Sequence, residues 1–201
     1  MGERQIFQPL TREDAITVVL YRIGIVLSTI MISGLAYLLM AASSNADTAP
    51  LSSLADILAF GLYASVGMSV FFIHLYVGKF KIYLKNLYYL SLGCLVMLFF
   101  IGDGSLANAV LHEAYSRLLL LPLCGCLGFV TAKEAFCFKL LEGYILAIGM
   151  PVYLILVSGN IISPRGASYG LVLIAAMLVI FMLRKVFMPI PYDIGDKSAY
   201  Q

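Results

Sequence analysis

The Lys and Arg residues of this chain are divided unequally between the two sides of a six-span hydropathy pattern. All thirteen except Arg117 and Arg165 fall on one side. Because basic residues concentrate in the cytoplasmic loops of polytopic membrane proteins, this asymmetry predicts a membrane domain with both termini in the cytoplasm. The composition agrees, since only 12% of the residues are charged, against about 25% in soluble domains. We therefore expect an all-α, multi-pass helix bundle in the cell (inner) membrane.

Six apolar stretches predict the transmembrane helices. A helix needs about 20 apolar residues to cross a hydrocarbon core of ~30 Å. The fourth stretch is the shortest, and its fifteen uncharged residues reach only about 22 Å. Without that crossing the thirteen basic residues would divide seven against six, so we retain it as a span. The predicted spans are residues 16–42, 57–77, 84–101, 118–132, 143–162 and 168–183.

The chain predicts one membrane domain without a separate soluble domain. Residues 1–15 are expected to form a cytoplasmic segment, residues 16–188 the six-helix domain, and residues 189–201 a cytoplasmic tail with a mobile polar end. Small residues four positions apart predict close helix contacts, within the bundle or across a dimer. These pairs are Gly61 with Ser65, Gly128 with Ala132, and Gly143 with Ala147.

The densest polar segment of the chain lies between the fourth and fifth spans, at residues 131–142. As structure, its Phe rings would enter the membrane interface while its charges meet headgroups and water. As chemistry, Lys133 would lower the pKa of the Cys137 thiol, and Glu134 would act as a general base. Residues near the cytoplasmic end of the second span are expected at the same depth. The candidate polar cluster comprises His74, Tyr76, Lys133, Glu134, Cys137 and Glu142.

Arg22 is the other charged residue predicted to lie at membrane depth. One interpretation has its side chain reaching the inner surface, and the other is an ion pair with Glu142 or Glu134. No metal site is predicted, and the four cysteines do not suggest disulfides, because none lies on the outer side. His112 is expected across the membrane from His74, which disfavours a bis-histidine haem. No cofactor is predicted, and a bound lipid or pigment remains the alternative.

Three short blocks carry a resemblance to a known family. They are residues 17–24 (TVVLYRIG), residues 73–77 (IHLYV) followed by a basic stretch, and residues 133–138 (KEAFCF). Across residues 10–184 the chain resembles the bacterial and cyanobacterial integral membrane proteins that contain domain of unknown function 2301. The resemblance implies a multi-pass membrane protein and no assigned activity.

The function favoured by the sequence is that of a non-catalytic accessory, assembly or stabilising subunit of a membrane complex. Short loops and few ionisable residues within the spans favour it. The alternatives are a membrane enzyme or lipid- or pigment-binding protein that uses the polar cluster, and a small transporter. The expected partners are the lipid bilayer and either another membrane protein or further copies of the chain. A net charge of +2 gives no indication of nucleic-acid binding.

Overall fold

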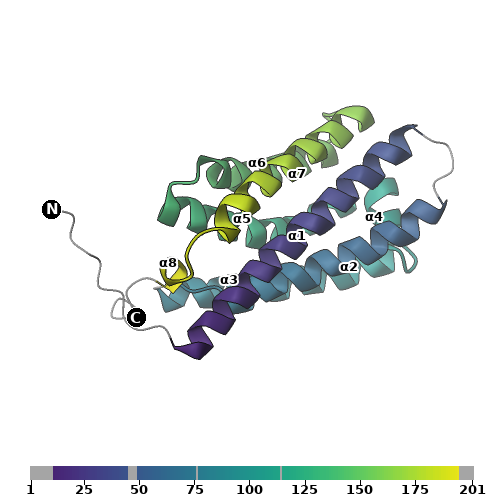
Figure 1. Cartoon of the computed structure of the whole chain (residues 1–201). Coiled ribbons are helices and arrows are strands. Elements are labelled where there is room, and N and C mark those ends of the chain that lie inside the picture. The colour runs from purple at the N-terminus through teal and green to yellow at the C-terminus, as the bar shows by residue number, and fades with distance from the viewer. Residues whose placement is uncertain (1–10, 45–48, 76, 114, 195–201) are drawn as a thin grey trace.

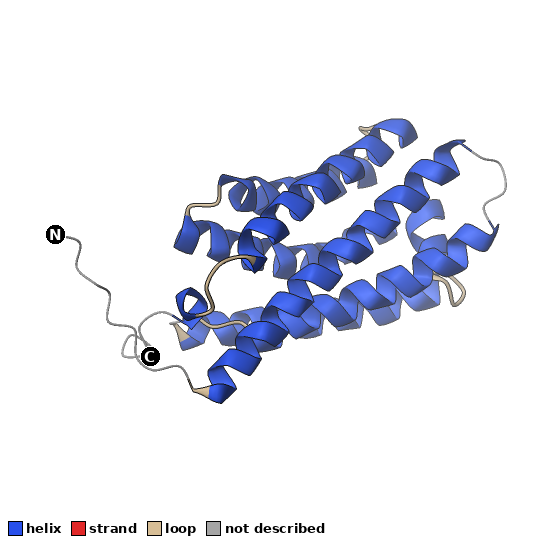
Figure 2. Cartoon of the chain, viewed as in Figure 1, coloured by secondary structure: helices blue, strands red, loops and turns tan. Residues whose placement is uncertain are grey.

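The computed structural model describes residues 11–44, 49–75, 77–113 and 115–194, and these residues form helices without any strand (Figures 1 and 2). Six helices or helical runs are long and apolar enough to cross a membrane, which confirms the predicted all-α bundle. The elements are α1 (Arg12–Ser44), α2 (Ala49–Phe72), α3 (Gly78–Ile101), α4 (Leu106–His112), the 3₁₀ helix η1 (Tyr115–Leu120), α5 (Leu121–Phe138), α6 (Leu141–Ser158), α7 (Pro164–Val186) and α8 (Pro191–Ile194).

The fourth span is longer than its uncharged stretch. η1 continues into α5, and together they give a run of 24 residues, Tyr115–Phe138. The run includes the charged residues Arg117 and Lys133 near its two ends, and the side chains of both make polar contacts with other groups of the protein. Arg117 donates to the carbonyl oxygens of Val110 at 2.7 Å and Val157 at 3.0 Å, and Lys133 contacts Glu134. The span therefore reaches full length with its ends tied to neighbouring segments.

Close helix contacts hold α1 against α2 and α5 against α6. A Cβ atom added at Gly24 would lie 2.8 Å from the carbonyl oxygen of Ser65, and one at Gly143 would lie 2.6 Å from the carbonyl oxygen of Thr131. Ser28 of α1 also shares a hydrogen bond of 2.9 Å with Ser65 of α2. Small side chains in these positions let the backbones approach, which is how helices associate in lipid. α7 packs against both α1 and α6 and links the two pairs.

The segment after α7 returns to the bundle. We name the end of the bundle where α1 and α3 begin and α5 and α7 finish the basic end, because most Lys and Arg residues lie there. Figure 1 shows α8 beside the first turns of α1 at this end. Asp193 and Ile194 are buried, so the tail predicted as residues 189–201 begins with a packed segment. Residues 195–201 lie outside the described residues.

Candidate functional site: a buried ion-pair cluster

Arg22 of α1 is bound to the segment that follows α7. Its Nε lies 2.7 Å from Oδ2 of Asp193, and its Nη2 lies 2.6 Å from the same oxygen. Its Nη1 donates to the carbonyl oxygens of Val186 at 3.0 Å and Met188 at 2.6 Å. Val186 is the last residue of α7, where helix carbonyls lack partners and the helix dipole favours a cation. The guanidinium thus caps α7 and fixes the chain beyond it.

Lys185 lies between the two buried carboxylates of this end. Its ammonium contacts both Glu134 and Asp193, and the whole side chain is enclosed. The ring of Phe138 lies 4.2 Å from Nζ, a distance that allows a cation–π interaction. Lys185 therefore connects α5, which carries Glu134, with α8, which carries Asp193.

Glu134 is fully enclosed, and both of its carboxylate oxygens have partners. Oε1 accepts hydrogen bonds of 2.7 Å from the hydroxyl of Tyr21 and from Nζ of Lys133, and Oε2 faces Lys185. A buried carboxylate stays ionised only where such donors replace the water it has lost. The neighbouring cations and the hydroxyl supply that replacement.

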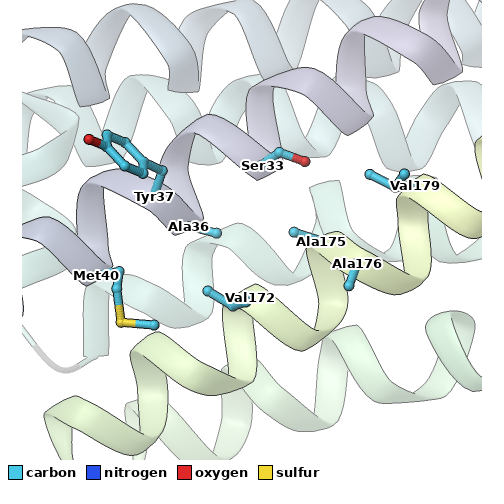
Figure 3. Close-up of a pocket in the computed structure, with 8 residues that line it drawn as sticks. All are labelled: Ser33, Ala36, Tyr37, Met40, Val172, Ala175, Ala176 and Val179. Carbon is cyan, nitrogen blue, oxygen red and sulfur yellow. The ribbon is translucent and has the colours of Figure 1, made fainter.

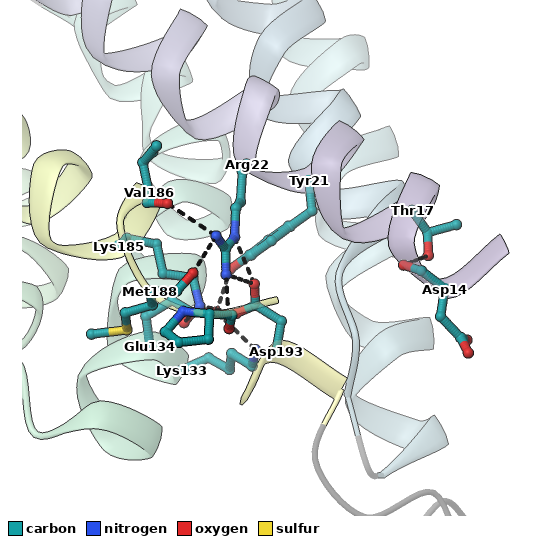
Figure 4. A network of polar contacts seen from close by, with 11 residues as sticks. Asp14, Thr17, Tyr21, Arg22, Lys133, Glu134, Lys185, Val186, Met188 and Asp193 are labelled. Carbon is teal, nitrogen blue, oxygen red and sulfur yellow. Dashed lines mark hydrogen bonds and ion pairs between the residues drawn. The ribbon is translucent and has the colours of Figure 1, made fainter. Parts of the chain in front are cut away.

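We call this set of six side chains the ion-pair cluster (Figure 4). Three cations and two carboxylates give it a formal charge of +1. It joins α1 and α5, which are distant in sequence, to α7 and the neighbouring α8. Its members are Tyr21, Arg22, Lys133, Glu134, Lys185 and Asp193.

The structure brings together only part of the cluster that the sequence suggested. Lys133 and Glu134 are bonded to each other, whereas Cys137 is exposed on the last turn of α5. His74 lies in the connection between α2 and α3, where its Nε2 is 3.3 Å from the hydroxyl of Thr17. Tyr76 lies outside the described residues.

The partner of Arg22 differs from the expected one. Glu142 accepts from Nη1 of Arg184 at 2.8 and 2.9 Å, so it does not pair with Arg22. Glu142 is in the first turn of α6, which packs beside the end of α7, while Arg22 faces the chain beyond α7. Asp193, rather than Glu142, is the carboxylate that pairs with Arg22. Glu134 does not contact Arg22 directly, but Lys185 bridges Glu134 and Asp193.

Sequence reasoning did not place Tyr21, Lys185 or Asp193 in a site. In the sequence, Lys185 marks only the charged end of the sixth span, and Asp193 lies in the polar tail. One signal was present: Asp193 follows Pro189 and Pro191, which predict a sharp turn back after a helix. A carboxylate on such a turn is well placed to meet cations at the helix end.

The chemistry open to these residues is limited by their pairing. Lys133 is bound to Glu134, and Glu134 is enclosed by its three donors. Burial lowers the pKa of His74 below its usual value, and the charges of Lys133 and Lys81 lower it further, which favours a neutral ring. Among the described residues, no group of three or more His, Cys, Asp or Glu is placed to hold a metal ion. The cluster thus links α1, α5, α7 and α8 through paired charges.

Six spans and a paired polar cluster at their basic end define a polytopic α-helical membrane protein. The chain belongs to the family described as "Uncharacterized integral membrane protein (DUF2301)", whose model matches residues 68–201. This match confirms the resemblance seen in the sequence, although it begins later than residue 10. It covers Lys133, Glu134, Lys185 and Asp193 but not the α1 members of the cluster. No curated protein and no solved structure matches the chain.

Proposed function

We propose that this protein is a non-catalytic accessory protein that assembles or stabilises a larger complex in the cell (inner) membrane, with both of its termini in the cytoplasm. The orientation rests on the basic end, which by the positive-inside rule belongs on the cytoplasmic side. The membrane assignment rests on the six spans and the family match.

The observation that supports a non-catalytic role is the complete pairing of the buried carboxylates. Every carboxylate oxygen of Glu134 and Asp193 faces a cation or hydroxyl of the same chain. An enzyme or a transporter needs groups that can exchange protons or ligands, and those groups usually have a pocket or a free position beside them. Here the charged side chains connect α1, α5 and α7 with α8 in the segment after α7, and such a role is consistent with a structural subunit.

A cavity between α1 and α7 is also lined mainly by apolar side chains. It is an open groove with a volume of about 390 Å³ (Figure 3). Ser33 and Tyr37 contribute from α1, and Val172 and Ala176 contribute from α7. Such a surface suits contact with lipid or with another membrane helix.

A membrane enzyme that uses Cys137 is the second candidate, favoured by the exposure of this thiol one turn from Lys133. One experiment separates the two functions. The gene is deleted, membrane complexes are profiled by native electrophoresis with mass spectrometry, and wild-type or Cys137→Ala protein is returned.

An accessory role predicts that a particular complex, which co-migrates with this protein, is lost on deletion and restored by both proteins. Abundant, folded Cys137→Ala protein that fails to restore the wild-type phenotype would overturn the proposal and favour the enzyme. Unchanged complexes after deletion would also overturn it.

A further inference from the structure

The imidazole ring of His74 connects the segment between α2 and α3 to the first turns of α1. Its Nε2 lies 3.3 Å from Oγ1 of Thr17. The same Oγ1 lies 3.1 Å from the carbonyl oxygen of Glu13 and 2.9 Å from that of Asp14. Carbonyl oxygens only accept hydrogen bonds, so the Thr17 hydroxyl donates to one of them and accepts from the ring. The network therefore assigns the hydrogen of the neutral ring to Nε2 and leaves Nδ1 without one.

The other ring nitrogen of His74 is enclosed where an added proton would have no acceptor. Nδ1 is buried and has no hydrogen-bond partner among the residues that the structure describes. A buried polar group without a partner is costly, and the cost is larger when the group is charged. Protonation of Nδ1 would create such a charged donor, so the present position of the ring suits its neutral form.

Charged side chains from four elements surround the ring of His74. Lys133 of α5 and Lys81 of α3 oppose a positive charge on it, whereas Asp14 of α1 and Asp193 of α8 favour one. Asp14 already accepts from the residue before α1, and Asp193 is paired within the ion-pair cluster. Burial lowers the pKa of His74 most, and the two lysines lower it further, so together they outweigh the two carboxylates.

We propose that His74 is a proton-operated latch between α1 and the connection that joins α2 to α3. The neutral ring holds this connection against Thr17. When a proton from the solvent binds Nδ1, the ring leaves its place so that the new N–H reaches water, and the connection detaches from α1. Ile73 directly before it is buried in the hydrophobic core, so the release is local. The latch thus makes the packing of the basic end depend on pH.

The latch goes beyond the proposed function and does not depend on it. A pH-dependent release of one connection can regulate an accessory protein, an enzyme or a transporter, and an accessory protein can act without it. In the orientation proposed above, the latch responds to acidification of the cytoplasm.

The first measurement is an NMR titration of the full chain in lipid nanodiscs. The chain has two histidines, so labelling at histidine gives two sets of ring signals, which His74→Gln assigns. We expect His74 to carry its hydrogen on Nε2 at neutral pH and to titrate below the ordinary value of about 6.5. A neutral ring with its hydrogen on Nδ1, or a midpoint at or above 6.5, would overturn the proposal.

The second measurement is amide hydrogen exchange of the connection between α2 and α3, compared between variants at the same pH so that intrinsic rates cancel. His74→Gln stays neutral and its amide can still donate to Thr17, so this variant should remain docked in acid. His112→Gln is the matched control, because it removes the histidine of α4 and leaves the latch intact. Thr17→Val removes the acceptor of the ring, so its connection should exchange faster than the wild type already at neutral pH.

Relative to His74→Gln, the wild type and His112→Gln should exchange faster as the pH falls. Between the pKa values of the released and the docked ring, each pH unit should increase the open fraction by up to about tenfold. Equal exchange of the wild type and His74→Gln at every pH, loss of the acid response in His112→Gln, or wild-type exchange of Thr17→Val at neutral pH would each refute the latch.

Discussion

Replacing Arg22 by leucine tests whether the ion-pair cluster stabilises the fold. The change removes the contact with Asp193 and the bonds to the carbonyl oxygens of Val186 and Met188. The side chains of Arg22 and Asp193 are 11% and 1% exposed, so water cannot replace the lost partner well. Breaking a buried ion pair in this way costs about 3–5 kcal/mol.

The expected change in melting temperature follows from that free energy. In proteins of this size 1 kcal/mol corresponds to about 2–4 °C, so Arg22→Leu should lower the melting temperature by about 10 °C. The assay is thermal unfolding of purified protein in a mild detergent, with limited proteolysis to follow release of the segment after α7. Arg22→Lys should recover only part of the loss, because one ammonium cannot reproduce the planar fork.

Arg184 supplies the matched control, since its side chain is 52% exposed and its ion pair with Glu142 lies at the surface. Such pairs contribute at most about 1 kcal/mol, so Arg184→Leu should cause a small shift. In the double variant Arg22→Leu/Asp193→Asn, the loss should be smaller than the sum of the single losses, because the two residues share one interaction. A melting temperature of Arg22→Leu equal to that of the wild type, or no lower than that of Arg184→Leu, would refute the reasoning.

Three further predictions concern other residues. Cys137 is the exposed cysteine of the described part, so an impermeant thiol reagent should label it in inverted vesicles and not in intact cells; labelling of intact cells would contradict the topology. Cys137→Ala should leave abundance and thermal stability unchanged, as measured by quantitative blotting and unfolding, because no bond of the ion-pair cluster uses the thiol. The pKa of His74 is lowered in the folded state, chiefly by burial and then by Lys133 and Lys81. The unfolded chain therefore binds the proton more readily, and stability should fall as the pH drops below about 6.5; if His74→Gln shows the same acid loss, another group is responsible.

The topology could be predicted from the sequence because it depends on summed properties of long segments. Hydropathy and the distribution of Lys and Arg identified six spans, including the short fourth one. The exact length of that span could not be predicted, since the carbonyl partners that allow Arg117 to lie within it come from residues 110 and 157.

The ion-pair cluster could be predicted only in part. A sequence indicates how deep a residue lies in the membrane more readily than it indicates which neighbouring helix its side chain faces. Arg22 was recognised as a residue in need of a partner, and Glu134 and Lys133 were placed at the correct end. Which carboxylate meets which cation depends on the rotation of each helix and on the path of the chain after α7. For that reason the sequence suggested Glu142 or Glu134 as the partner of Arg22, and it did not suggest Asp193, which also lies at the basic end.

The contact between Arg22 and Asp193 has a consequence for how the protein is made. The two residues are 171 positions apart, and chain synthesis proceeds at about 5–20 residues per second. The first helix therefore holds an uncompensated arginine in the membrane for roughly 10–30 s before its carboxylate partner leaves the ribosome. A chain truncated before Asp193 lacks the carboxylate that pairs with Arg22. The closing of α1 onto the segment after α7 thus takes place only after all six spans have been synthesised.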